Sequence, residues 1–167
     1  MTTQIKGNAT STFGGNVDVT GNVITDAPIF SAYKSSSQSI SAGVWTLITL
    51  DTEEIDSNSN FDTSTSKFQP SIAGWYHINY LVNTVTACNG YAYGALYKNG
   101  SAQTYNGTLY TGAYVGADVT VTFSTLVYMN GTTDYLQMYY YQSATTSPSV
   151  NYGANRTKLS GYLARVV

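Results

Sequence analysis

Apolar and polar residues alternate with a period of two along much of this chain. In the stretch WYHINYLV, Tyr76, Ile78, Tyr80 and Val82 share one face of an extended strand, and the intervening residues share the other. The apolar set is expected to face a core. No segment of a dozen residues shows the i, i+3, i+4, i+7 spacing of an amphipathic helix. The pattern therefore predicts an all-β protein.

The segment 118–129 changes character along its length. Val119, Val121 and Phe123 alternate with polar residues, whereas the following STLVYM is apolar at both positions of the alternation. A strand with this pattern begins half exposed, because only one of its faces is apolar. We expect it to end covered on both faces.

Asn-Gly pairs separate several of the apolar runs, at residues 99–100, 106–107 and 130–131. Both residues of such a pair accept positive φ, so each pair predicts a tight turn. The last run, residues 158–167, alternates up to the final residue and is expected to pair on both sides within a sheet. Many short strands joined by tight turns are typical of a sandwich or jelly roll.

The N-terminal stretch GGNVDVTGNV repeats Gly-Asn-Val after six residues, at 15–17 and 21–23. A period of six with Gly, small polar residues and Val resembles the β-structured shaft repeats of bacteriophage tail fibres, in which three chains wind together. Val17, Val19 and Val23 would then contact the other chains. Two repeats cannot form a core alone, so the interpretation requires partner chains. A flexible Gly/Asn/Thr linker is the alternative.

Composition excludes several functional classes. The chain has 167 residues, 43% of them hydrophobic, and a net charge of only −2, which indicates a folded domain. Its seven Lys and Arg are scattered, so we expect no nucleic-acid partner. No uninterrupted apolar run approaches the length of a membrane span, and we expect no membrane insertion. The single cysteine, Cys88, has no cysteine partner within the chain.

Four segments together carry a family resemblance: FDTSTSKFQPSIAGWYHINYLV, YGALYKNG, MNGTTDYLQM and KLSGYLA. In this order they resemble the globular head of the complement C1q-like family, a relative of the tumour necrosis factor jelly roll. The resemblance implies a ten-stranded jelly-roll sandwich that forms a homotrimer, with a shaft entering at its base. We therefore expect a shaft at residues 1–28 and a C1q-like head at residues 29–167. The collagen-like Gly-X-Y segment of most animal members is absent.

The stretch YLQMYYYQ is apolar on both faces of a strand. Leu136, Met138 and Tyr140 form one face, and Tyr135, Tyr139 and Tyr141 form the other. Such a strand needs two burial partners. One is the domain core, and the resemblance implies that the other is the trimer axis. Tyr135, Tyr139 and Tyr141 are therefore the expected interface residues of the head.

The loop EEIDSNSNFD contains a weak candidate metal site. Oxygen-bearing side chains recur at every second position, as hard cations prefer. These residues are Asp56, Asn58, Asn60 and Asp62. Phe61 and Lys67 stand where an EF-hand loop requires Gly and Glu, so that template fails. We therefore expect no cofactor, with calcium as the alternative.

Catalysis is not indicated by the sequence. The only histidine, His77, lies within a predicted strand, and the chain has no nucleophile elbow and no His-Glu-x-x-His motif. A structural or interface role is expected for His77. We do not expect an enzyme.

Tyrosine is the most conspicuous residue type, with sixteen in the chain. A cluster among Gly and Thr in TYNGTLYTGAYVG is typical of a binding surface. The candidate receptor-binding residues are Tyr105, Asn106, Thr108, Tyr110, Thr111 and Tyr114. Edge-strand packing is the alternative explanation for these tyrosines.

The expected function is that of a virion protein, the trimeric tip of a bacteriophage tail fibre. Its head would recognise a host surface receptor, for which a saccharide is the favoured class, and its shaft would join other tail or fibre proteins. Two alternatives remain open. One is a purely structural cap that trimerises the fibre, and the other is a bacterial cell- or spore-surface adhesin.

Overall fold

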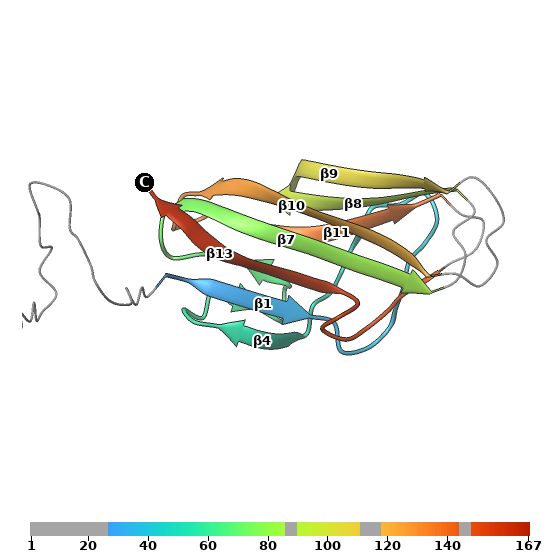
Figure 1. Ribbon diagram of the computed structural model, residues 1–167, viewed down its shortest axis with the longest axis horizontal. Helices are drawn as coiled ribbons and strands as arrows, with labels where there is room; N and C mark the ends of the chain where they lie inside the picture. Colours follow the sequence, from blue (N-terminus) through green and yellow to red (C-terminus); the bar gives the residue numbers. More distant parts are fainter. Residues whose placement is uncertain (1–26, 86–89, 111–117, 144–147) are drawn as a thin grey trace, which may run out of the picture.

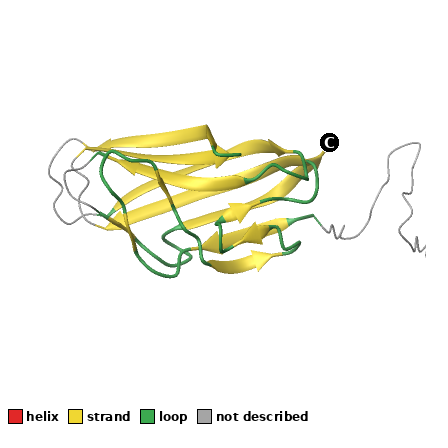
Figure 2. Cartoon of the chain, turned by 180° about the vertical axis from the view of Figure 1, so that it is seen from behind, coloured by secondary structure: helices red, strands yellow, loops and turns green. Residues whose placement is uncertain are grey.

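The computed structural model describes residues 27–85, 90–110, 118–143 and 148–167, with the backbone alone at residue 90 and residues 104–110. These residues form thirteen strands, five of them only two residues long, and no helix. The strands build two antiparallel sheets that pack face to face (Figures 1 and 2). Within the described part of the chain, no helix has the length and hydropathy of a membrane span. The predicted all-β sandwich is confirmed.

The larger sheet contains seven strands. Its centre is β7, which pairs with β10 on one side and with β13 on the other, and β13 continues to β1 and β4. Short strands β12 and β2 extend from the end of β7. The bounds are β1 Ile29–Tyr33, β2 Gln38–Ser39, β4 Thr52–Asp56, β7 Gly74–Val85, β10 Val119–Met129, β12 Ser149–Val150 and β13 Lys158–Val166.

The smaller sheet contains six strands. Strand β8 lies between β9 and β11, and β11 pairs on its other edge with β6 and β3. The bounds are β3 Thr46–Leu47, β5 Phe61–Asp62, β6 Lys67–Phe68, β8 Gly90–Lys98, β9 Ser101–Tyr110 and β11 Leu136–Gln142.

The core fills the space between the sheets, as the alternation predicts. Tyr76, Ile78, Tyr80 and Val82 of β7 are fully buried. On the facing sheet, β11 contributes three more buried side chains: Leu136, Met138 and Tyr140. Burial of a large apolar side chain stabilises the fold by about 1.5–3 kcal/mol. These residues therefore hold the two sheets together.

The three Asn-Gly pairs have different outcomes. Asn99 and Gly100 both have positive φ, at 53° and 79°, and form the β8–β9 hairpin as predicted. The pair at 130–131 also forms a turn, in which Asn130 Oδ1 accepts three backbone N–H groups. The turn predicted at 106–107 is wrong, because that pair lies inside β9. The backbone there pairs with Gly94 and Tyr93 of β8, so the hairpin continues through it.

The C-terminal run forms β13, which lies between β1 and β7 and pairs with both, as predicted. Gly161 sits at a point where β13 and β7 approach each other closely. A Cβ atom there would lie 2.6 Å from the carbonyl oxygen of His77 and 2.7 Å from a methyl group of Ile78. The glycine therefore permits β13 to approach β7 closely.

The two ends of the sandwich are distinct. Strand β1 begins where β13 ends, and the Leu163 backbone N–H donates to the Pro28 carbonyl over 2.9 Å (Figure 1). Strands β9 and β11 end, and β10 begins, at the opposite end. We call these the base and the far end of the head. Residues 1–26 lie outside the described residues, so the shaft and its boundary with the head stay predictions.

Candidate functional site

Aromatic side chains cover the outer face of the smaller sheet. Strand β8 carries tyrosines two residues apart at 91 and 93 and again at 97, while β11 carries Tyr139 and Tyr141. The register places Tyr93 directly opposite Tyr141. Trp45 precedes β3, the short strand that pairs with the other edge of β11. We call this set the aromatic face: Trp45, Tyr91, Tyr93, Tyr97, Tyr139 and Tyr141.

The rings of the aromatic face contact one another in a continuous series. The Tyr97 and Tyr139 rings are stacked, with centroids 4.0 Å apart and planes 22° from parallel. The Trp45 ring lies 5.5 Å from that of Tyr141 and 6.2 Å from that of Tyr97. Aromatic pairs in this distance range contribute about 0.5–1.5 kcal/mol beyond area burial. The face is therefore a packed surface layer.

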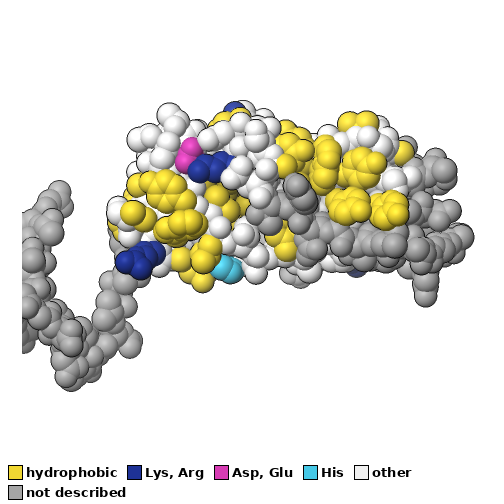
Figure 3. Space-filling model, turned by 90° about the horizontal axis from the view of Figure 1, so that it is seen from above, with side chains coloured by type: hydrophobic (Ala, Val, Ile, Leu, Met, Phe, Trp, Pro, Cys, Tyr) yellow, Lys and Arg dark blue, Asp and Glu magenta, His cyan; other side chains and the backbone are white. Residues whose placement is uncertain are grey.

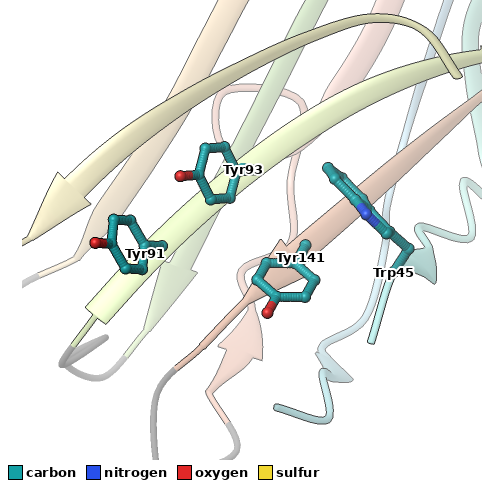
Figure 4. Close-up of a pocket in the computed structure, with 4 residues that line it drawn as sticks. All are labelled: Trp45, Tyr91, Tyr93 and Tyr141. Atoms are coloured by element: carbon teal, nitrogen blue, oxygen red, sulfur yellow. The ribbon is translucent and has the colours of Figure 1, made fainter. Parts of the chain in front are cut away.

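Part of the aromatic face is hollowed. A cavity of about 550 Å³, open to solvent, is lined by Trp45, Tyr91, Tyr93 and Tyr141 (Figure 4). Tyr91 and Tyr93 come from β8, Tyr141 comes from β11, and Trp45 closes the other side. Small-molecule sites commonly occupy about 300–1,000 Å³. The aromatic hollow, as we name these four residues and the space between them, is large enough for a ligand.

Backbone hydrogen bonds fix the walls of the aromatic hollow. The Tyr91 N–H donates to Ser143 Oγ over 2.7 Å, and the Ser143 N–H donates to the Tyr91 carbonyl over 2.9 Å. On the Trp45 side, the Gly43 N–H donates to the Gln142 carbonyl over 2.8 Å. The lining side chains therefore stand on backbone that is tied together across three segments.

The outer face of the larger sheet carries a second patch, in which exposed apolar side chains lie next to the half-buried His77. Leu126 of β10, His77 of β7, Tyr162 of β13 and Ile29 of β1 are opposite one another in the register and form a row across four strands. Leu126 is 56% exposed and Tyr162 is 46% exposed. Beside the row, the Trp75 and Tyr128 rings lie 5.8 Å apart. We call the four residues and this ring pair together the apolar row: Ile29, Trp75, His77, Leu126, Tyr128 and Tyr162.

The apolar row bears on the prediction that β10 ends covered on both faces. Strand β10 was expected to end covered on both faces, but Leu126 and Tyr128 are 56% and 37% exposed. Figure 3 shows hydrophobic side chains gathered around the only histidine, toward the base of the head. His77 itself packs 5.2 Å from the Tyr162 ring, and its buried Nδ1 has no hydrogen-bond partner among the described residues. The covering expected for β10 is therefore not supplied by the chain's own described residues.

The predicted receptor residues lie partly within β9. The backbones of Tyr105, Asn106, Thr108 and Tyr110 pair with those of Ala95, Gly94, Ala92 and Gly90 of β8. This places the segment beside the strand that carries Tyr91 and Tyr93. Thr111 and Tyr114 lie outside the described residues, so the receptor assignment stays a prediction.

The predicted interface residues of the head lie among intrachain partners. Tyr139 stacks on Tyr97, Tyr141 contacts Trp45 and Tyr93, and the Lys67 ammonium lies 4.2 Å from the centre of the Tyr135 ring. The second burial partner that this strand face requires is therefore supplied in part by the same chain. Val17, Val19, Val23 and Cys88 lie outside the described residues.

The weak candidate metal ligands include two carboxylates that accept hydrogen bonds from residues close to them in sequence. Asp56 Oδ2 accepts the Phe61 N–H over 2.6 Å, and Asp62 accepts the hydroxyls of Ser64 and Thr65 over 2.6 and 2.7 Å. These bonds lower the pKa of Asp62 to about 2. Among the described residues, no group of three or more His, Cys, Asp or Glu side chains converges on one point. Calcium binding by Asp56, Asn58, Asn60 and Asp62 stays an untested alternative.

Sequence reasoning missed most of the aromatic hollow. Tyr91 and Tyr93 alternate visibly in GYAYGALYK, so the pattern alone places them on one strand face. Trp45 stands in the short run VWTL, far from both in sequence, and no local signal connects it with them. Only the pairing of β3 with β11 brings it to this face.

Comparison with known proteins identifies the fold. No family model matches the sequence, and no curated protein matches it significantly. The structure resembles the globular domain of zebrafish complement 1qA, with a TM-score of 0.62, 12% identity, and coverage of 84% of this chain and 99% of that one. It also resembles the Eiger TNF from S. frugiperda, with a TM-score of 0.62, 8% identity, and coverage of 84% of this chain and 93% of that one. For murine APRIL at pH 8.0 the TM-score is 0.63, the identity is 8%, and the coverage is 82% of this chain and 98% of that one. The chain therefore has the C1q/TNF-like jelly-roll fold.

Proposed function

We propose that this chain is the trimeric tip of a bacteriophage tail fibre, located in the virion, whose head recognises the host cell surface. Three features support the proposal: the jelly-roll fold, the shaft-like repeat at residues 15–23, and exposed surfaces suited to contact. The role is binding rather than catalysis, in keeping with a sequence that has neither a nucleophile elbow nor a His-Glu-x-x-His motif. Other tail or fibre proteins hold the shaft, and the head meets the receptor.

The observation that carries the proposal is the apolar row on the larger sheet. Contiguous exposed apolar surface of this kind marks an interaction site. Ile29 belongs to the row and begins β1. If the preceding residues form a shaft, that shaft would join the head beside this face and bring partner heads together there. In a threefold arrangement around this face, Leu126, Tyr162 and Trp75 would be covered by neighbouring chains. We therefore assign the interface to the apolar row rather than to Tyr135, Tyr139 and Tyr141, which already have partners in their own chain.

The assembly is tested by the mass of the particle in solution. Light scattering should give three times the chain mass of 18.0 kDa. Replacing Leu126 with Asp should dissociate the trimer, because each interface would bury a carboxylate without a partner at a cost of several kcal/mol. The matched control is Tyr152→Asp, which adds the same charge at a 59% exposed residue outside the row. A parent monomer, or a Leu126→Asp variant that remains trimeric, would contradict the assignment.

Host recognition is tested by adsorption competition. The isolated trimer, added before the phage that encodes it, should occupy host receptors and reduce phage attachment. A trimer that folds but does not compete would instead favour the purely structural cap.

A further inference from the structure

We propose that the aromatic hollow formed by Trp45, Tyr91, Tyr93 and Tyr141 binds a neutral saccharide. This inference rests on the host-recognition function proposed above and names the chemical class of its ligand. It differs from the candidate segment in β9, because the four residues come from β8, β11 and the chain before β3.

The described residues that line the aromatic hollow offer no positive charge to an anionic ligand. All four lining residues are uncharged. The basic residues near this sheet face, Lys67 and Lys98, are engaged at the other end of β8 and β11. Lys67 lies over the Tyr135 ring, and Lys98 Nζ pairs with Asp134 Oδ2 over 2.8 Å. A sulfated or sialylated polymer would therefore find no free counter-charge among these described residues.

The polar tips of the lining residues favour a saccharide over an apolar peptide or lipid. Three phenol hydroxyls and one indole N–H border the space, and none forms a hydrogen bond with another residue whose side chain the structure describes. In Figure 4 the Tyr91 and Tyr93 rings stand side by side along β8, with their hydroxyls on the same side. A sugar ring offers an apolar face for stacking and hydroxyls at its edge, so it matches both parts of these side chains.

The spacing and rigidity of the rings suit a short oligosaccharide. The Tyr91 and Tyr93 centroids are 6.0 Å apart with planes 14° from parallel, and the Tyr93 and Tyr141 centroids are 6.1 Å apart. The Tyr91–Ser143 hydrogen bonds fix the backbone that carries the first ring. At the other side, the Trp45 ring lies between those of Tyr141 and Tyr97. Side chains fixed before binding lose little conformational entropy when a ligand arrives. The platform is therefore preorganised.

The position of the aromatic hollow fits recognition by a fibre. Tyr91 stands near the start of β8 and Tyr141 near the end of β11, and both of these strand ends lie toward the far end of the head (Figure 1). The hollow is also on the opposite sheet from the apolar row. Trimerisation through the row would leave three copies of the hollow open to solvent.

The test uses Trp45 as a reporter of its own site. The chain has only two tryptophans, so Trp75→Phe leaves Trp45 as the sole one. The substitution keeps an aromatic ring in the apolar row, and light scattering verifies that this variant is still a trimer before the titration. This variant is titrated with neutral oligosaccharides of glucose, mannose, galactose and N-acetylglucosamine, and with sialyllactose and a heparin fragment as anionic probes. At least one neutral oligosaccharide should change Trp45 emission saturably in the millimolar range or below, since single contacts of this kind are weak. The anionic probes should not.

Variants of the lining locate the binding. Tyr91→Ala, at a 46% exposed residue, and Tyr93→Ala should each reduce affinity by about tenfold or more, because each removes a stacking face. Tyr91→Phe keeps that face and should bind more tightly than Tyr91→Ala. Tyr152→Ala removes an exposed tyrosine elsewhere and should change nothing. Light scattering verifies that each variant remains assembled.

Three results would overturn the inference: no neutral probe binding, an anionic probe binding more tightly than every neutral one, or unchanged affinity in both alanine variants. Adsorption assays separate this failure from failure of the proposed function. If the parent trimer competes for host cells and the alanine variants compete equally, recognition stands and the aromatic hollow is not its site. If the parent does not compete, host recognition fails, and the titration alone decides whether the hollow binds saccharide.

Discussion

Asp134 shows how single residues hold the base of the head together. Its carboxylate accepts hydrogen bonds from Asn99 Nδ2 over 2.7 Å and from the Asn130 N–H over 3.0 Å, and it pairs with Lys98. Burial raises the pKa of Asp134, but the hydrogen bonds from Lys98, Asn99 and Asn130 outweigh it, so the pKa lies below the ordinary value of 3.8. The β8–β9 turn and the turn before β11 are thereby joined through one side chain.

The first prediction concerns Asp134 and pH. A carboxyl group whose pKa is lower in the folded than in the unfolded state stabilises the protein at pH values above its unfolded-state pKa. This contribution is lost as the pH falls from about 3.8 through the folded-state pKa. Asp134→Asn should therefore lower the free energy of unfolding by about 1–3 kcal/mol at neutral pH. The gap between parent and variant should narrow as the pH falls from about 3.8 through the folded-state pKa. Urea denaturation at one protein concentration measures both.

Glu53→Gln is the matched control for this prediction, because it removes one negative charge from an exposed residue of β4. It should leave the free energy of unfolding unchanged at neutral pH and as the pH falls. An Asp134→Asn variant as stable as the parent at neutral pH would mean that the carboxylate does not hold the two turns.

Strand β13 is the element on which the larger sheet depends. It supplies ladder partners to both β1 and β7, and Leu159 and Leu163 contribute to the core. Without it, both neighbouring strands would expose unpaired backbone groups and the core would open on one side. Peripheral strands such as β2 and β12 pair over only two residues and hold much less.

The second prediction concerns this element. Deleting residues 159–167 should abolish soluble, cooperatively folding protein, because the loss removes the ladder on two sides and buried core side chains together. Deleting only Val166 and Val167, which are 61% and 75% exposed, should be tolerated. Expression followed by thermal unfolding monitored by circular dichroism distinguishes the two. A long deletion that still unfolds cooperatively would contradict a central role for β13.

At the scale of the whole molecule, the two sheets serve different contacts. The larger sheet presents the apolar row near the base, and the smaller sheet presents the aromatic face on the other side of the sandwich. Under the proposed function, the row joins three heads and the aromatic hollows meet the receptor. Each single contact is weak, so the trimer would bind through several copies at once.

The third prediction follows from this division. The monomer produced by Leu126→Asp keeps its aromatic hollow, so it should bind an oligosaccharide in solution as the parent does. On host cells it should compete for adsorption about a hundredfold less well, since multivalent attachment raises avidity by roughly 10²–10⁴. Tyr152→Asp, which stays trimeric, should compete like the parent. Equal competition by the monomer and the trimer would show that attachment does not depend on assembly.

Turn chemistry illustrates what sequence alone leaves open. The pairs at 99–100 and 106–107 are both Asn-Gly, yet only the first forms a turn, while the second lies within the ladder between β9 and β8. An Asn-Gly pair accepts positive φ but does not require it. Whether the chain turns depends on where the partner strand ends, which is a property of the pairing. Gly94 is similar, because a Cβ atom there would lie 2.5 Å from the buried Tyr80 ring, and no local pattern announces that contact.

The sequence by itself determined the all-β class, the buried set Tyr76, Ile78, Tyr80 and Val82, and the pairing of the last strand. The physical reason is that neighbouring side chains on a strand point to opposite faces and apolar ones must be covered. Family-like segments added the jelly-roll fold. Only the tertiary structure decided which outward-facing residues meet. Trp45 joins Tyr93 and Tyr141 because β3 pairs with β11, and Ile29, His77 and Leu126 form one row because four strands share a register. Such contacts depend on strand order, which alternation does not encode, since it records the face of each residue but not its neighbours across the sheet.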